Sequence, residues 1–234
     1  MNTPVVALVV AAGSGSRLGG PVPKALVEID GRALVRWSVD ALAAGGCERA
    51  VVVVAEALLP DFRRALDGTS IPVDLVVGGA RRQDSVARGL AAAGSQGVVL
   101  VHDAARPFVP VDVARGVVES VRAGHVCVVP VVAVVDTIRQ RTGEDSRVVD
   151  RSALAAVQTP QGFDLETLRA AHAEVERRGL EVTDDASVCE AVGHPVHLVP
   201  GSRESLKVTE PFDLVVARAV AATRSPHSLE QELP

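Results

Sequence analysis

The chain has 234 residues, of which 47% are hydrophobic and only 2% aromatic, and its formal net charge is −5 at pH 7. This acidic balance argues against general binding to nucleic acid or to anionic membranes, so any polyphosphate must be held by a local basic cluster, and the shortage of aromatic rings disfavours base stacking. A core of Val, Ala and Leu is typical of parallel strands covered by helices on both faces, here within one domain.

The first predicted strand, Val5–Val10, leads directly into a glycine- and serine-rich loop that is followed by two cations. Small residues let the backbone approach an anion, and successive N–H groups can point at phosphate oxygens. Arg17 and Lys24 supply positive charge, and Lys24 is one of only two lysines in the chain, the other being Lys207. The segment therefore predicts a cradle for nucleotide phosphates, with a surface turn rich in glycine as the structural alternative.

Two better-known phosphate loops do not fit this segment. A Rossmann dinucleotide fingerprint would need glycine where Leu18 stands, followed by a helix that Pro21 and Pro23 would interrupt. A Walker loop would need Gly-Lys-Ser or Gly-Lys-Thr where the chain has Leu-Gly-Gly.

Further along the first half, short β-branched runs alternate with alanine-rich helical patterns, which is the rhythm of right-handed βαβ units. The pattern predicts strands at Arg49–Ala55, Ile71–Val77, Gly97–His102 and His125–Val132, and helices at Ala33–Ala44, Leu59–Leu66, Asp84–Ala93 and Asp112–Arg122. The predicted fold class is α/β, with an open, mostly parallel sheet.

A second glycine pair, at Gly78 and Gly79, joins a predicted strand to a helix. Gly79 allows the main chain to meet the edge of a planar base, and Ser85 offers a hydroxyl that can contact it. By itself this segment is equally well explained as an ordinary turn between strand and helix.

Asp103 follows another predicted strand, at the edge where open α/β sheets bind ligands. Its carboxylate is a candidate to hold magnesium, directly or through water, or to accept a substrate hydroxyl, and Arg106 is a candidate to bind a phosphate. The structural alternative is a helix cap with an Asp103–Arg106 salt bridge. We interpret His102 as a buried, hydrogen-bonded histidine and not as a catalyst.

The alternation breaks between Val134 and Leu154, where two polar limbs, Asp136–Gln140 and Arg147–Arg151, flank a turn sequence. This is a β-hairpin signal. A hairpin without an apolar face is at best marginally stable by itself. We therefore expect residues 134–154, approximately, to protrude as an arm that packs on a second copy of the chain. A plain surface hairpin is the alternative.

The C-terminal part predicts a helix at Asp164–Arg178, a helix capped by Thr183 that begins at Asp184, and a last helix from Pro211. Lys207 is predicted in a short strand, where a solvated charge is the alternative interpretation. We expect one domain over residues 1–223 and a disordered tail over residues 224–234.

Cys47, Cys127 and Cys189 are odd in number, far apart and in apolar contexts. They are therefore expected to be buried free thiols, and neither disulfides nor zinc ligands. The N-terminal sequence has no basic region followed by a cleavable apolar segment, and no apolar run reaches membrane-spanning length. We expect a cytoplasmic protein.

Taken together, these motifs resemble the 2-C-methyl-D-erythritol 4-phosphate cytidylyltransferase family. Singly the motifs are weak, but their order is specific and spans the chain up to the final helix. They are the segments Ala11–Lys24, Gly78–Val86, His102–Pro107, Asp136–Thr137, Asp150–Arg151, Gln158–Gln161, Thr183–Ser187 and Leu206–Thr209. The resemblance implies a Rossmann-like sheet with helices on both faces, a homodimer joined by a hairpin arm that helps complete the partner's site, and Mg²⁺ as cofactor.

The resemblance also implies the reaction and the residues that serve it. A phosphate oxygen of the sugar-alcohol phosphate attacks the α-phosphorus of CTP and releases pyrophosphate, without a general base. The implied catalytic residues are Arg17, Lys24, Arg151 and Lys207. The implied nucleotide-binding residues are Ala11, Ala12, Gly13, Gly15, Gly79 and Ser85. The implied acceptor-binding residues are Asp103, Arg106, Thr137 and Thr159, and Asp103 is also the candidate metal ligand.

Two other functions remain open at this point. One is a cytidylyltransferase for another polyol phosphate, such as ribitol 5-phosphate, and the other is a nucleotide-binding module without turnover.

Overall fold

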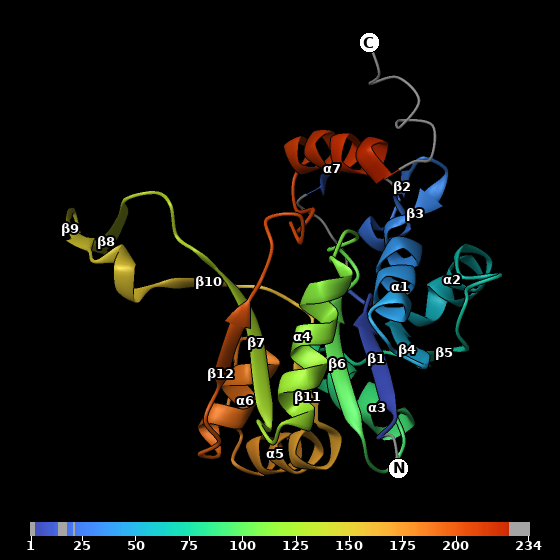
Figure 1. Cartoon of the computed structure of the whole chain (residues 1–234), viewed down its shortest axis with the longest axis horizontal. Helices are drawn as coiled ribbons and strands as arrows, with labels where there is room; N and C mark the ends of the chain where they lie inside the picture. The colour runs from blue at the N-terminus through green and yellow to red at the C-terminus, as the bar shows by residue number, and fades with distance from the viewer. Residues whose placement is uncertain (1–2, 14–17, 21, 225–234) are drawn as a thin grey trace.

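The computed structural model describes residues 3–13, 18–20 and 22–224 (Figure 1). Within this described part, eight strands form the central sheet, seven of them in one hydrogen-bonded order. That order is β10 (Ala155–Val157), β7 (Cys127–Ala133), β11 (Gln161–Asp164), β6 (Val98–Asp103), β1 (Val5–Val10), β4 (Arg49–Val54) and β5 (Val73–Val77), and β12 (His197–Pro200) pairs with β7. β6, β1, β4 and β5 are mutually parallel, whereas β11 runs antiparallel to β6. The predicted α/β fold with a mostly parallel sheet is confirmed.

Helices cover both faces of the sheet because successive side chains of each strand point to opposite sides. In β1, Val5, Ala7 and Val9 join one buried cluster, while Val6 and Leu8 join the other. The first cluster packs against α1 (Leu34–Ala44), α2 (Leu59–Ala65) and α4 (Val111–Arg122). The second packs against α3 (Arg82–Ala92), α5 (Leu165–Arg177) and α6 (Asp185–Ala191). The last helix, α7 (Pro211–Arg224), lies beyond one end of the sheet (Figure 1).

Several short elements are absent from the predicted pattern. A small hairpin, β2 (Glu28–Ile29) and β3 (Arg32–Ala33), follows the 3₁₀ turn η2 (Lys24–Leu26). β10, β11 and β12 also appear only in the structure. They are three or four residues long, which is too short for a clear period of hydrophobic residues.

Three local predictions in the C-terminal part are wrong. Asp184, and not Thr183, caps α6, since its carboxylate accepts from the Ser187 N–H at 2.9 Å and is the better acceptor. Lys207 lies in the loop between β12 and α7, not in a strand. Arg224 is the last residue of α7, so it does not belong to the predicted tail, and residues 225–234 lie outside the described residues.

The arm is present, with both limbs shifted by two residues toward the tip. β8 (Ile138–Thr142) and β9 (Asp145–Val149) pair antiparallel, and Gly143 takes a positive φ of 71° in the turn between them. Figure 1 shows this hairpin projecting from the body of the molecule. All of β8 is exposed.

The predicted state of the cysteines is confirmed, because Cys47, Cys127 and Cys189 are all buried free thiols. In the part of the chain that the structure describes, no helix has the length and apolarity that a membrane span needs.

Candidate functional site

The C-terminal ends of β1 and β6 bring the first glycine loop next to Asp103. The two strands are parallel neighbours, with Val10 opposite Asp103 in the register. The N–H of Ala104 donates to the carbonyl of Val10 at 3.2 Å, and the N–H of Ala11 donates to Val53 at 2.8 Å. The glycine loop and the Asp103 loop therefore leave the sheet side by side, at the edge where open α/β sheets bind ligands.

The second glycine pair lies against the first loop. A Cβ atom on Gly78 would be 2.8 Å from Cβ of Ala12 and 2.9 Å from Oγ of Ser85, so only glycine permits this approach. The Gly79 N–H donates to Ser85 Oγ at 3.1 Å, and that hydroxyl donates to the Arg81 carbonyl at 3.2 Å. The structure thus brings Ala12, Gly79 and Ser85 to one corner. Gly13, which follows Ala12 in the chain, is exposed. Gly15 and Arg17 lie outside the described residues.

Asp103 lies between two cations that come from distant parts of the chain. Lys207 Nζ is 2.7 Å from Oδ2, and Arg82 Nη1 donates to Oδ1 at 2.9 Å. The carboxylate is only 11% exposed. Burial alone would raise the pKa of Asp103, but the charges of Arg82 and Lys207 outweigh it and hold that pKa below its usual range. Asp103 is therefore ionised at neutral pH.

The structural alternative for Asp103, a helix cap with a salt bridge to Arg106, is wrong. The nearest following helix, α4, begins at Val111 and is preceded by Pro110. The Arg106 guanidinium instead donates to the carbonyl of Ser205 at 2.7 Å. This bond ties the Asp103 loop to the loop that carries Lys207.

His102 and Thr159 support Asp103 from inside the sheet. Thr159 Oγ1 accepts from the Asp103 N–H at 3.1 Å and lies 2.9 Å from His102 Nδ1, while His102 Nε2 lies 3.0 Å from the Arg106 carbonyl. Burial lowers the pKa of His102 to about 4, so the ring is neutral and its two nitrogens serve as one donor and one acceptor. His102 is a buried, hydrogen-bonded histidine, as interpreted from the sequence.

An apolar cluster holds the Lys207 loop beside the N-terminal loop. Leu206 and Val208, on either side of Lys207, pack in one cluster with Leu18 and Val27. Leu18 directly follows Arg17, and Val27 lies one turn after Lys24. Lys24 and Lys207 are therefore carried by segments that share a small core with Ile29, Leu34, Phe108, Ala217 and Ala221.

Thr137 and Arg151 do not meet this cluster within one chain. Both lie on or beside the arm, and the Arg151 guanidinium donates to the Val135 carbonyl at the arm's base. Because the arm projects from the body (Figure 1), a shared site would need the arm of a second copy.

Two charged residues beside Asp103 are missing from the sequence-based site. Arg82 Nη2 lies 3.4 Å from Asp185 Oδ2, and Asp185 Oδ1 lies 3.0 Å from His172 Nε2. Arg82 is the first residue of α3 and lies within the Gly78–Val86 segment, but an arginine in the first turn of a helix carries no signal that marks it as a site residue. Asp185 is an acid in the first turn of α6 that is only 2% exposed, and no sequence pattern distinguishes it from an ordinary helix-end acid.

Metal ligation by a cage of side chains is not indicated. The described residues contain no group of three or more His, Cys, Asp or Glu side chains placed to hold a metal ion.

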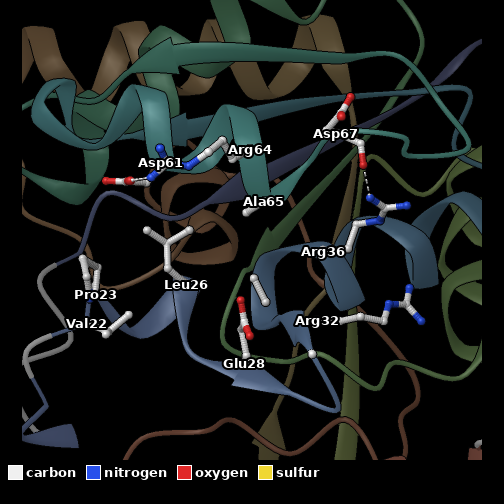
Figure 2. A pocket seen from close by; sticks show the side chains of 12 residues that line it. Val22, Pro23, Leu26, Glu28, Arg32, Arg36, Asp61, Arg64, Ala65 and Asp67 are labelled. Atoms are coloured by element: carbon white, nitrogen blue, oxygen red, sulfur yellow. Dashed lines mark hydrogen bonds and ion pairs between the residues drawn. The ribbon is translucent and has the colours of Figure 1, made fainter.

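A separate hollow of about 750 Å³ lies between the Lys24 turn and α2 (Figure 2). Leu26, Arg36 and Arg64 line it, and none of its lining residues is a predicted site residue. Its arginines already have partners, since Arg36 donates to the Asp67 carbonyl and Arg64 pairs with Asp61. The chemistry of the candidate site therefore belongs to the Asp103 edge and not to this hollow.

Comparisons with known proteins agree over nearly the whole chain. The family model for 2-C-methyl-D-erythritol 4-phosphate cytidylyltransferase matches residues 5–223. A relative of that name from Nocardia farcinica is 45% identical, and the match covers 94% of this chain and 95% of the relative. Another from Saccharopolyspora erythraea is 48% identical, and the match covers 93% of this chain and 99% of the relative. The crystal structure of the protein of that name from Thermus thermophilus is 40% identical with a TM-score of 0.78, covering 94% of this chain and 99% of its own.

Proposed function

We propose how the site works from one premise: this chain belongs to the 2-C-methyl-D-erythritol 4-phosphate cytidylyltransferase family. It is a nucleotidyltransferase that transfers CMP from CTP to 2-C-methyl-D-erythritol 4-phosphate, the acceptor, in isoprenoid biosynthesis. The observation that supports our assignment of the site is the Lys207–Asp103 pair, 2.7 Å apart, beside the loop that follows β1.

The reaction needs positioning and charge stabilisation more than proton transfer. The acceptor phosphate is already an anion near neutral pH, so it attacks the α-phosphorus of CTP in line and pyrophosphate departs. We assign the triphosphate to the backbone of Ala11, Ala12 and Gly13, with Lys24 and Arg17 stabilising its developing negative charge. Gly79 and Ser85 occupy the corner that we assign to the cytosine and its sugar.

We assign the acceptor to the Asp103 edge. Lys207 is 39% exposed, so its ammonium can reach a phosphate dianion, and Asp103 can accept a hydroxyl of the polyol. Arg106 and Thr159 serve by fixing the Lys207 loop and the Asp103 backbone, respectively. Thr137 and Arg151 complete the same pocket from another subunit's arm.

We propose Mg²⁺ as the divalent cation. With no cage of acidic ligands among the described residues, the ion would be held mainly by nucleotide phosphate oxygens and by water, as Mg²⁺ commonly is. Asp103 would contact it through water, because both carboxylate oxygens already accept from cations. When bound, the ion neutralises charge on the triphosphate.

We propose a homodimer joined by the arms. The arm carries two residues assigned to the acceptor pocket and lies away from that pocket in its own chain. Val135 and Val148 are 54% and 59% exposed, so the arm also offers apolar surface to a partner.

We further propose that the protein works in the cytoplasm. Its three buried free thiols suit a reducing compartment.

Pyrophosphate release from CTP tests the acceptor assignment. We expect release with 2-C-methyl-D-erythritol 4-phosphate and a kcat/KM at least about 100-fold lower with ribitol 5-phosphate, because a site that hydrogen-bonds particular hydroxyls rejects an acceptor that places them elsewhere. Equal use of both acceptors, or release with ribitol 5-phosphate alone, would contradict the assignment. CTP without acceptor is the control.

A further inference from the structure

Arg82 is a second positive charge beside Asp103, separate from Lys207, which we assign to the acceptor phosphate. Its guanidinium reaches Asp103 Oδ1 at 2.9 Å, while Lys207 reaches Oδ2 at 2.7 Å. The two cations therefore occupy different oxygens of one carboxylate. Lys207 sits on a loop, whereas Arg82 belongs to the first turn of α3.

Arg82 is also held from its other side. Its Nη2 lies 3.4 Å from the buried carboxylate of Asp185, which in turn lies 3.0 Å from His172 Nε2. Burial would lower the pKa of Arg82, but the charges of Asp103 and Asp185 outweigh it and raise that pKa. Arg82 is thus a permanently charged group fixed between two buried carboxylates.

The acceptor phosphate must compete with Asp103 for Lys207. If Lys207 were the only cation at Asp103, moving it to the substrate would leave an ionised, nearly buried carboxylate without compensation, which is strongly unfavourable. Arg82 removes this penalty because it stays in place when Lys207 moves. We propose that Arg82 is a positioning residue that frees Lys207 to bind the acceptor phosphate.

This inference rests on the proposed function, in which Lys207 binds the acceptor. It makes a specific kinetic prediction, because Arg82 contacts Asp103 and would act through it on the acceptor side of the site.

The test compares KM for each substrate and kcat in five variants. Arg82→Met is expected to raise the acceptor KM about tenfold or more, while the KM for CTP and kcat change less than about threefold. Arg82→Lys is expected to restore the acceptor KM to within about threefold of wild type, because the ammonium keeps the charge although it cannot bridge two carboxylates. Arg81→Met is the matched control, since Arg81 pairs with Asp84 and Glu176 and is expected to behave as wild type.

Asp185→Asn distinguishes two roles for Arg82: a counter-charge for Asp103, or one link in a structural chain of contacts from Asp103 to Asp185. Arg82 still faces Asp103 in this variant, so we expect an acceptor KM within about twofold of wild type. If the chain of contacts were only structural, breaking it at Asp185 would raise the acceptor KM as much as breaking it at Arg82. Thermal unfolding shows whether each variant is folded. If Arg82→Met does not fold, Arg82→Lys and Asp185→Asn carry the test, and both are expected to keep the acceptor KM near wild type.

Three results would overturn the proposal: an unchanged acceptor KM in folded Arg82→Met, no rescue by Arg82→Lys, or an Asp185→Asn defect as large as that of Arg82→Met. Lys207→Ala, measured in the same series, distinguishes failure of the Arg82 proposal from failure of the proposed function. An unchanged acceptor KM and kcat in Lys207→Ala would refute the role of Lys207 itself, whereas a Lys207→Ala defect beside a normal Arg82→Met would refute only the role of Arg82.

Discussion

Lys24→Ala is expected to lower kcat for CMP transfer by about 10²–10³-fold while the protein remains folded, because a preorganised charge at the developing negative charge contributes on this scale. Lys24 begins the 3₁₀ turn η2, and the turn is closed by its backbone, since the Val27 N–H donates to the Lys24 carbonyl at 3.1 Å. Alanine keeps that bond and removes the side-chain ammonium. The loss should therefore appear chiefly in the rate.

Single-turnover formation of pyrophosphate at saturating CTP measures this effect. Arg17→Ala, outside the described residues, is expected to fall in the same range. Arg64→Ala is the control, because Arg64 is a nearby cation on the rim of the hollow in Figure 2, pairs with Asp61 and has a side chain that is 78% exposed. Wild-type turnover in Lys24→Ala would contradict the assignment of the triphosphate.

Deleting Val135–Arg151 is expected to give a folded monomer with less than about one hundredth of wild-type activity, because the arm carries both the proposed interface and part of the proposed acceptor pocket. The body should tolerate the deletion. β8 and β9 pair with each other, and Ala133 of β7 already faces Ala155 of β10, so the four residues that remain between them can form a hairpin loop.

Light scattering with size-exclusion chromatography reports the oligomeric state of this deletion variant, and circular dichroism reports its fold. A fully active monomer would refute the shared site. A folded variant that remains a dimer would refute the arm as the dimer contact.

The framework of the fold is predictable because it rests on local patterns. Val5–Val10 is a continuous buried run, and the helices of the first half repeat their apolar residues at helical spacing, so most boundaries lie within two residues of those expected. β11 shows the limit. It contains Gly162, whose backbone lies so close to α4 that a Cβ would be 2.3 Å from Val117, and this long-range fit leaves no local signal.

The site is predictable in part for a similar reason. Asp103 is recognisable because it ends a buried strand, and the glycine loop because its composition is unusual. Arg82 is not recognisable, since an arginine in the first turn of a helix is ordinary until Asp103 and Asp185 are brought beside it. Lys207 stands out only as one of two lysines, and its link to Asp103 depends on packing between residues a hundred positions apart.

The association of Thr137 and Arg151 with the acceptor comes from the family resemblance and not from contacts within this chain. In the proposed homodimer, these two residues would make each active site a property of two subunits.

Mixing Arg151→Ala with Lys207→Ala tests this shared site most directly. Each homodimer is expected to be nearly inactive with the acceptor, because each lacks one charged residue of the acceptor site in both pockets. After subunit exchange, half of the dimers carry both kinds of chain, and one of the two pockets in each of them is intact, so the mixture should recover about a quarter of wild-type activity. A mixture no more active than the separate variants, although exchange is verified by mass spectrometry, would contradict a pocket built from the body of one subunit and the arm of another.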